Sequence, residues 1–329
     1  MDKRSVETEN RPFGWAFIGC GGIAGGVAKE LLKDGGGKIV ACWNRTKSRA
    51  EKFASRFGCA STDTAEQAIT FDGVEGVYVA TTHDVHGYYT RLAVSLGVPV
   101  LCEKPFTVNA NEAREVFGAA REKGVYVSEA MWTWHNKPAH IVRDWVKSGR
   151  VGEIKSASVT YAFPMLQFSD NPRLTSPELI GGALLDIGIY PIRYMYELFG
   201  MPKKITAEGE KRGGVDISEK ITMDYGAFRA DLTVSMDKLI GEKLVIEGSD
   251  GRITVPFFHM AKRGRLTGKN KDSFKINALL YATQFRRVAE EIRSGKVDSE
   301  FCPAQATIDT MTLLDECRRQ LGVVYPCEK

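Results

Sequence analysis

The sequence predicts an α/β fold with two domains: a doubly wound parallel sheet in residues 1–128 and an α+β domain with a mainly antiparallel sheet in residues 129–329. Up to residue 128, short apolar runs alternate with helix-length amphipathic stretches, which is the pattern of repeated βα units. After residue 128, strand-like alternation with a period of two residues becomes prominent. The length of 329 residues gives each domain room for its own hydrophobic core.

In the first domain, five apolar runs are predicted to be strands: Trp15–Ile18, Ile39–Trp43, Gly76–Ala80, Pro99–Cys102 and Val125–Val127. The amphipathic stretches between them are predicted to be helices: Ile23–Lys33, Lys47–Phe57, Val85–Leu96 and Asn109–Lys123. Glycines at positions 35–37, 97 and 124 stand where these helices should end and the chain should turn back to the sheet.

The second domain is predicted to contain a helix near Pro138–Lys147, a strand at Ile154–Phe163 and a helix at Ala183–Phe199. A meander then extends from Ile205 to Pro256 and includes the alternating stretches Ile221–Tyr225 and Phe228–Met236. Lys243–Gly248 and Arg252–Pro256 flank Ser249-Asp250-Gly251, which predicts a hairpin. The last two predicted helices lie near Asn277–Arg293 and Pro303–Leu321.

Composition and charge argue against several classes of protein. The net charge of +4 is small for this length and gives no basic stripe for nucleic acid. No apolar run approaches the roughly 20 residues of a membrane span, and Met1–Pro12 lacks the apolar stretch of a secretion signal. The seven cysteines show no C-x-x-C pair and no metal-type spacing with histidine. We therefore expect a cytoplasmic protein with no metal site and no nucleic-acid or membrane partner.

A glycine-rich turn follows the first predicted strand. The run Gly19-Cys20-Gly21-Gly22-Ile23-Ala24 has the form G-x-G-x-x-A and opens the first predicted helix. Gly19 permits the tight turn, Gly21 lets the backbone approach a pyrophosphate, and Ala24 is small enough for close helix packing. The helix N-terminus offers unpaired N–H groups to phosphate. In this context the motif predicts dinucleotide binding rather than a merely tight turn.

The end of the second predicted strand bears on which dinucleotide binds. An NAD site usually has a carboxylate there for the ribose 2′-hydroxyl, but this chain has Asn44-Arg45-Thr46-Lys47. Arg45 can bind a 2′-phosphate and stack on adenine, and Thr46 and Lys47 add donors. This favours NADP(H), with NAD(H) as the alternative. The competing interpretation is that Arg45 and Lys47 are solvated charges at the start of a helix.

Two further groups of residues predict chemistry. Glu103-Lys104-Pro105 ends the fourth predicted strand, and open α/β sheets bind ligands beyond the carboxyl ends of their strands. Asp186 and Tyr190 lie at i and i+4 in an apolar helix, so they share one face and need polar partners, which Lys104 and a substrate hydroxyl can supply. The alternatives are an exposed turn lysine and a helix-packing tyrosine capped by an aspartate.

Together the G-x-G-x-x-A, the E-K-P and the run G-G-A-L-L-D-I-G-I-Y resemble the glucose-fructose oxidoreductase, inositol dehydrogenase and rhizopine catabolism family (Gfo/Idh/MocA). The tyrosine at the end of the last motif, Glu129–Trp132 and Leu321–Pro326 resemble its dihydrodiol and D-xylose dehydrogenase branch. This resemblance implies an N-terminal Rossmann domain and an open, mostly antiparallel C-terminal sheet. It also implies a homodimer or higher homo-oligomer formed through that sheet.

The resemblance implies that Lys104 and Tyr190 act beside the nicotinamide, with Asp186 orienting them. Thr81–His86 is similar to the family's loop after the fourth Rossmann strand, where His86 is typical and His83 replaces a common asparagine. The expected cofactor contacts are Gly19, Gly21, Gly22, Ile23, Ala24, Asn44, Arg45, Lys47, Thr81, His83, His86, Glu103 and Lys104. The expected substrate contacts are Trp132, Phe163, Arg173 and Tyr190, since aromatic side chains can stack on a sugar or an aromatic diol.

These residues predict an NADP-preferring dehydrogenase or reductase of a sugar, polyol or cyclic diol. Hydride passes between the substrate carbinol carbon and nicotinamide, and Tyr190 moves the hydroxyl proton while Lys104 favours the phenolate. Two alternatives on the same fold are a nicotinamide-binding sensor and a glycoside-cleaving enzyme whose NAD returns the hydride to the substrate. The retained Lys104 and Tyr190 argue against the sensor. Arg45 and the tyrosine at the end of the last motif argue against the glycoside-cleaving enzyme.

Overall fold

The computed structural model describes residues 11–169, 171–277 and 279–328, so most of the segment Met1–Pro12 lies outside it. Contacts divide the chain into two compact units. Unit 1 comprises the described residues up to Phe106 together with Arg114–His135 and Leu279–Ala304. Unit 2 comprises Thr107–Ala113, Asn136–Ala278 and Gln305–Lys329 as far as they are described. Each unit is thus assembled from three stretches of sequence.

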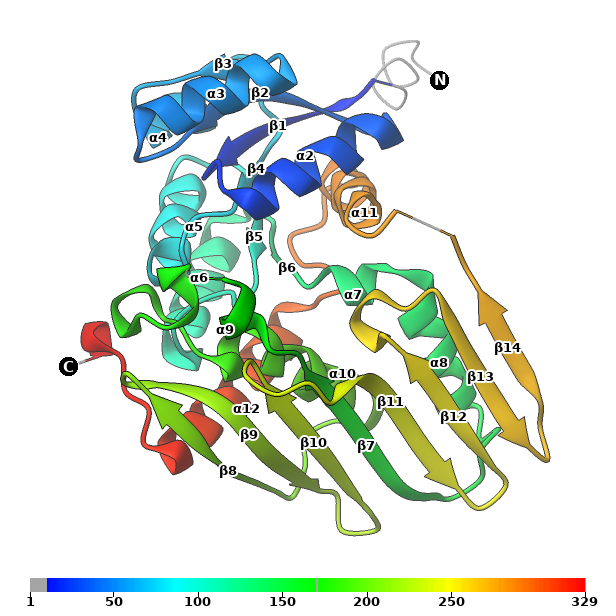
Figure 1. The fold of residues 1–329 in the computed structure, drawn as a ribbon. Helices are drawn as coiled ribbons and strands as arrows, with labels where there is room; N and C mark the ends of the chain where they lie inside the picture. Colours follow the sequence, from blue (N-terminus) through cyan, green and yellow to red (C-terminus); the bar gives the residue numbers. More distant parts are fainter. Residues whose placement is uncertain (1–10, 170, 278, 329) are drawn as a thin grey trace, which may run out of the picture. The chain divides into compact units, whose positions relative to one another are not determined.

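Unit 1 contains a six-stranded sheet with the order β3-β2-β1-β4-β5-β6, and every neighbouring pair is parallel. The strands are β1 (Phe13–Ile18), β2 (Gly37–Trp43), β3 (Ala60–Ser61), β4 (Gly76–Val79), β5 (Val100–Glu103) and β6 (Val127–Ala130). The strand order reverses between β1 and β4, which is where doubly wound sheets bind dinucleotides. The predicted Rossmann architecture is confirmed (Figure 1).

The helices of this part of the chain are α2 (Gly22–Asp34), α3 (Lys47–Phe57), α4 (Ala65–Ile69), α5 (His86–Ser95), α6 (Ala110–Lys123), α7 (Trp132–His135) and α11 (Ala282–Arg293). Helices α2 and α3 end at Gly35 and Gly58, whose φ angles of 78° and 71° are left-handed. Short β3 and α4 were not predicted. Helix α4 begins at a capping box between Thr64 and Gln67, a local feature that needs only a few residues.

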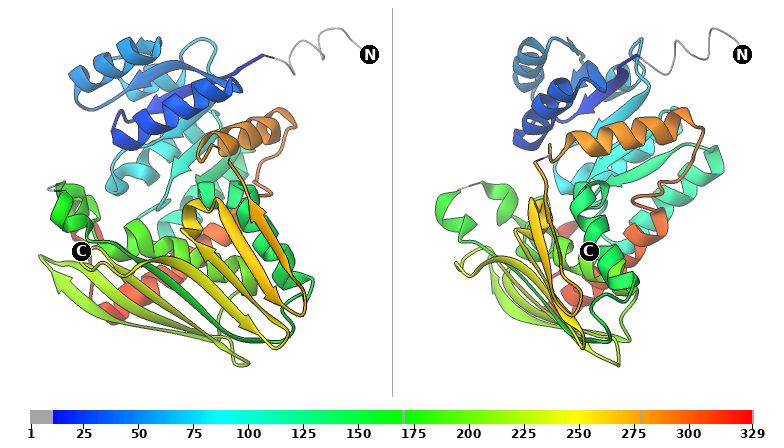
Figure 2. Two further views of the ribbon diagram at one scale, coloured as in Figure 1. Left: turned by 45° about the vertical axis from the view of Figure 1, so that its right-hand side comes forward. Right: turned by 90° about the vertical axis from the view of Figure 1, so that its right-hand side faces the viewer.

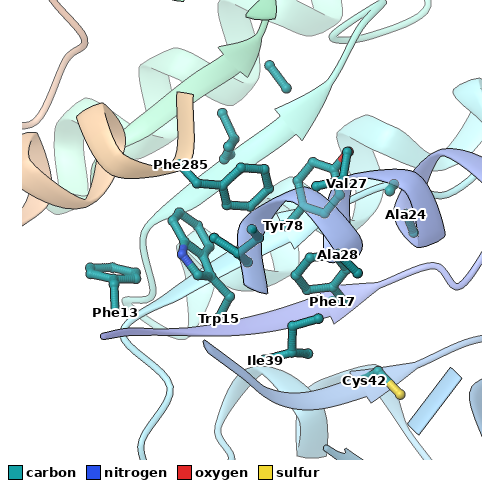
Figure 3. Close-up of a cluster of buried hydrophobic side chains, with 14 of the residues drawn as sticks. Phe13, Trp15, Phe17, Ala24, Val27, Ala28, Ile39, Cys42, Tyr78 and Phe285 are labelled. Carbon is teal, nitrogen blue, oxygen red and sulfur yellow. The ribbon is translucent and has the colours of Figure 1, made fainter. Parts of the chain in front are cut away.

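The core of unit 1 includes a helix from far along the sequence. Phe285 of α11 packs on Trp15 and Tyr78, with ring centroids 4.9 and 5.0 Å apart (Figure 3). Val288 and Ala289 of the same helix belong to this cluster. The sequence assigned all residues after 128 to the second domain, because an amphipathic pattern shows that a helix has an apolar face without showing which sheet that face covers.

Unit 2 contains an eight-stranded sheet with the order β14-β13-β12-β11-β7-β10-β9-β8. All neighbouring pairs are antiparallel except β7 and β10. The strands are β7 (Ile154–Ala162), β8 (Lys204–Arg212), β9 (Val215–Asp224), β10 (Arg229–Ser235), β11 (Gly241–Gly248), β12 (Gly251–Pro256), β13 (Arg263–Gly268) and β14 (Asp272–Lys275). The predicted mostly antiparallel sheet and the β11–β12 hairpin are confirmed, whereas β13 and β14 were not predicted.

The helices of unit 2 are α8 (Lys137–Lys147), α9 (Met165–Phe168), α10 (Ile189–Phe199) and α12 (Ala304–Leu321). Helices α8, α10 and α12 lie on one side of the sheet (Figure 2). A π-helical turn, Leu184–Gly188, precedes α10 directly. No helix within the described ranges combines the length and apolar character required to cross a membrane.

Candidate functional site

The glycine-rich turn of unit 1 connects β1 to α2. Gly19 has a φ of 101°, and a Cβ atom there would lie 2.4 Å from the carbonyl oxygen of Ala80, so only glycine fits. Around Gly21 and Gly22, in contrast, a Cβ atom would meet no heavy atom within 4 Å. Gly21 caps α2 without a side-chain hydrogen bond, and Ala24 is fully buried in the first turn. These residues fit a dinucleotide, because the helix N–H groups stay open to its phosphates.

Asn44 links the glycine-rich turn to the loop after β2. The backbone N–H of Cys20 donates to Asn44 Oδ1 at 3.1 Å, and Asn44 Nδ2 donates to the carbonyl of Thr46 at 3.1 Å. Lys47 forms a 2.7 Å ion pair with Asp63, and both side chains are exposed. Arg45 is exposed and forms no hydrogen bond or ion pair within the described part of the chain. Of the two predicted cations, Arg45 is therefore the one that a phosphate can bind without breaking an existing pair.

Three further cations lie beside this turn. A pocket of about 410 Å³ is lined by Gly21, Gly22 and the side chains of Arg49, Lys52 and Arg56. These side chains belong to none of the motifs found in the sequence, although their positions at i, i+3 and i+7 place them on one face of α3. They make this edge of unit 1 strongly positive, which suits a phosphate-bearing ligand.

The loops after β4 and β5 are joined by His86. Its ring nitrogens lie 2.8 Å from the carbonyl oxygen of Pro105 and 3.3 Å from that of Thr81. Burial lowers the pKa of this imidazole. His83 is also buried, with its ring centroid 5.6 Å from that of His86. His86 thus positions the turn that carries Lys104, and its direct contact with a cofactor stays a prediction.

Glu103, the last residue of β5, gives a testable pH dependence. It accepts a 2.5 Å hydrogen bond from the Tyr78 hydroxyl, and burial raises its pKa from 4.5 to about 7. Between these values the folded state holds a proton that the unfolded chain has released. The free energy of unfolding should therefore fall as pH rises from 4.5 to 7, by up to about 3 kcal/mol.

Glu103→Gln should remove this part of the pH dependence, because the amide cannot ionise. Urea unfolding of both proteins at about pH 5 and about pH 8 measures the difference. If both proteins lose the same free energy of unfolding between the two pH values, Glu103 is not the cause of the pH dependence.

In unit 2, the start of the helix that carries Asp186 and Tyr190 is held by distant residues. Asp216 of β9 accepts a 2.6 Å hydrogen bond from the backbone N–H of Leu184, and the Tyr325 hydroxyl donates to the carbonyl of Gly181 at 2.8 Å. Gly182 has a φ of 124°, and a Cβ atom there would lie 2.5 Å from Asp216 Oδ1. Asp216 was not predicted, because it lies 32 positions from its partner.

Asp186 lies in the π-helical turn, a geometry that often marks functional sites. It is buried and forms a bidentate pair with Arg173, whose two terminal nitrogens lie 2.8 and 3.3 Å from its carboxylate oxygens. Arg173 was expected to contact substrate, and Asp186 was expected to pair with Lys104. Within unit 2 these two predicted residues pair with each other, so the carboxylate charge is neutralised.

Tyr190 is the second residue of α10 and is buried among aromatic rings. Its ring centroid lies 6.1 Å from that of Tyr161 and 5.2 Å from that of His259. Phe163, an expected substrate contact, packs edge-on against Tyr161 at 6.1 Å. Phe163, Arg173, Asp186 and Tyr190 therefore all lie in unit 2. Lys104 and Trp132 lie in unit 1, where the Trp132 ring is 5.2 Å from that of Tyr281.

Comparisons with known proteins identify a family for both the N-terminal and the C-terminal part of the chain. The family model described as "Oxidoreductase family, NAD-binding Rossmann fold" matches residues 13–131, and the "GFO/IDH/MocA C-terminal domain" matches residues 140–254. Trans-1,2-dihydrobenzene-1,2-diol dehydrogenase from Mus musculus is 28% identical over 331 residues, covering 96% of this chain and 98% of that protein. The scyllo-inositol 2-dehydrogenase (NADP(+)) from Bacillus subtilis is 30% identical over 305 residues, covering 89% and 92%.

A solved structure is also similar along most of the chain. The 3-ketoreductase from Actinomadura kijaniata in complex with TDP-benzene and NADP has a TM-score of 0.80 and 25% identity, covering 94% of this chain and 98% of that protein. The two family models together span both the glycine-rich turn and the Asp186–Tyr190 segment. The protein is therefore a member of the Gfo/Idh/MocA family of NAD(P)-dependent oxidoreductases.

Proposed function

We propose that this enzyme is an NADP-preferring dehydrogenase or reductase acting on the CH–OH group of a sugar, polyol or cyclic diol. The observation that carries the proposal is the combination, in unit 2, of the buried Tyr190 phenol and an Asp186 carboxylate neutralised by Arg173. The names of similar proteins support the substrate class, since they specify a benzene diol, D-xylose and scyllo-inositol as substrates. Two of these names also specify NADP(+) as the cofactor.

The nicotinamide, when bound, supplies or accepts the hydride. Tyr190 exchanges a proton with the substrate oxygen, and Lys104 keeps the role that the family resemblance implies, which is to favour the phenolate form. Arg173 neutralises Asp186, so the carboxylate opposes the phenolate less than a lone charge would. Gly19, Gly21 and the start of α2 would hold the pyrophosphate of the cofactor, together with Ile23 and Ala24 in the first turn. Trp132 and Phe163 remain the predicted aromatic contacts for the substrate.

Arg45 is the residue that we expect to set the cofactor preference. Arg45→Ala should raise the KM for NADP⁺ by about tenfold to a hundredfold, because a charge-assisted contact to phosphate contributes about 1.5–3 kcal/mol. The KM for NAD⁺ should stay within about twofold. Lys47→Ala is the matched control, since Lys47 is paired with Asp63 and should contribute less. An unchanged ratio of the two KM values in Arg45→Ala would contradict the assignment.

The substrate class is tested by following the absorbance of reduced nicotinamide with NADP⁺ and NAD⁺ across aldoses, inositols, glucosides and a trans-dihydrodiol. Activity with NADP⁺ on one class supports the proposal and identifies the chemistry. Cofactor binding without turnover in either direction would instead favour a sensor. Glucoside cleavage without accumulation of reduced cofactor would favour the internally recycled hydride.

We also propose that the enzyme is cytoplasmic and forms a homodimer or higher homo-oligomer through the sheet of unit 2. All seven cysteines are free, which suits a reducing compartment. The strands β8, β9 and β10 present polar side chains such as Thr222, Asp231 and Thr233 around a surface pocket. Light scattering with and without substitutions on these strands measures whether the sheet forms the interface.

A further inference from the structure

A buried carboxylate–imidazole pair lies beside Tyr190, and neither the sequence analysis nor the family motifs assigned it a role. Glu242 of β11 and His259 of the short turn Phe258–Met260 are both buried. Glu242 Oε1 accepts hydrogen bonds from the backbone N–H of His259 at 2.9 Å and from its ring Nδ1 at 2.6 Å. These two contacts fix the imidazole ring against β11.

The second ring nitrogen of His259 extends this pair to a third residue. His259 Nε2 lies 3.2 Å from the Tyr161 hydroxyl, and the two rings stack with centroids 4.7 Å apart. The imidazole is therefore hydrogen-bonded at both of its ring nitrogens, to Glu242 through Nδ1 and to the Tyr161 hydroxyl through Nε2. The result is a hydrogen-bonded relay of Tyr161, His259 and Glu242.

Two features of this relay are energetically unfavourable: backbone strain at Phe257 and the burial of the Glu242 carboxyl group. Phe257 adopts a left-handed φ of 48°, which a bulky residue rarely does, and the chain then turns His259 toward Glu242. Burying a carboxylate is unfavourable unless its hydrogen bonds are satisfied, and an apolar pair would fill the same space without that penalty. A role in packing alone therefore does not explain these residues.

Tyr190 lies against two members of the relay. Its ring centroid is 5.2 Å from that of His259 and 6.1 Å from that of Tyr161. Packing alone restrains a ring weakly in its own plane, whereas hydrogen bonds are directional and fix the rings that surround it. We propose that Glu242 and His259 are positioning residues, which hold Tyr161 and Tyr190 in the orientation required for proton transfer. This inference rests on the proposed role of Tyr190.

The test replaces His259 with phenylalanine, which keeps a flat ring against Tyr190 and removes the hydrogen bonds. We expect kcat to fall by about tenfold or more, because small misplacements of a reacting group are costly. The KM for substrate and the Kd for NADP⁺ should stay within about twofold. His140→Phe is the matched control: His140 lies on α8, contacts Arg143 at 2.9 Å and should leave kcat unchanged.

Two further variants make the result specific. Tyr161→Phe keeps the ring and removes only the hydroxyl, so it should lower kcat without changing the substrate KM even if His259→Phe does not fold. In a Tyr190→Phe background, His259→Phe should lower the residual kcat by less than about twofold, since the two act through one group.

A folded His259→Phe protein with unchanged kcat would overturn the inference. So would a rise in KM instead of a fall in kcat for Tyr161→Phe, or a full additional loss in the Tyr190→Phe background. If the parent enzyme turns over no carbinol or carbonyl substrate with either cofactor, the proposed function itself fails, and the inference fails with it. An active parent with an unaffected His259→Phe overturns the inference alone.

Discussion

Tyr190→Phe is expected to lower kcat by about 10²–10⁴-fold in both reaction directions, because it removes the group that moves the substrate proton. The phenyl ring still fills the space beside Tyr161 and His259, so folding should be unaffected. Binding of NADP⁺ should also be unchanged, since the glycine-rich turn lies in the other unit. Steady-state kinetics on the best substrate and a fluorescence titration with NADPH measure the two effects. Lys104→Met should act in the same direction.

Tyr194→Phe is the matched control for this experiment. Tyr194 lies one turn further along α10 and is buried against Phe258, with ring centroids 5.5 Å apart. We expect its kcat to stay within about twofold of that of the parent. A Tyr190→Phe enzyme with parental kcat, or a loss of similar size in Tyr194→Phe, would remove Tyr190 from the mechanism.

Gly182→Ala is expected to have the largest effect on stability, lowering the free energy of unfolding by about 2–4 kcal/mol. A methyl group at this position would lie 2.5 Å from Asp216 Oδ1, and the φ of 124° is unfavourable for any other residue. Relief of the clash requires Asp216 to release the N–H of Leu184. Because that contact holds the start of the helix that carries Asp186 and Tyr190, kcat should fall as well.

Urea unfolding followed by circular dichroism measures the change in stability. Gly118→Ala provides the comparison, since Gly118 lies inside α6 and a Cβ atom there meets no heavy atom within 4 Å. It should stabilise the protein by about 0.5–1 kcal/mol, because alanine favours the helix. If Gly182→Ala were as stable as the parent, Asp216 would be free to move and would not be fixing the helix.

Much of the fold could be predicted from the sequence because its signals are local. The helix predicted at Lys47–Phe57 has these bounds in the structure, and the predicted strands of the Rossmann sheet fall within a few residues of those observed. Period-two and helical patterns repeat within short windows, and glycines mark where helices end. The elements that were not predicted include β3, α4, α7, α9, β13 and β14, which are short or polar and leave little pattern to detect.

The candidate site divides in the same way. Gly19, Arg45, Lys104 and the Asp186–Tyr190 spacing were available from the sequence, because a motif beside a strand or within a helix fixes which side chains lie at one end or on one face. The pairing of Arg173 with Asp186 could not be predicted from the sequence, although both residues had been proposed as site residues. Sequence spacing gives the position of a side chain along its own element and says nothing of the partner across a loop.

The sequence by itself therefore determined the fold class, the dinucleotide-binding turn and the family to which the chain belongs. Only the tertiary structure placed α11 on the first sheet, brought Asp216 to the start of the Tyr190 helix and joined Tyr161 to His259 across 98 positions. These contacts depend on how the chain closes long loops and packs one element on another. Each of these contacts joins residues that are distant in sequence, so no local sequence pattern predicts it.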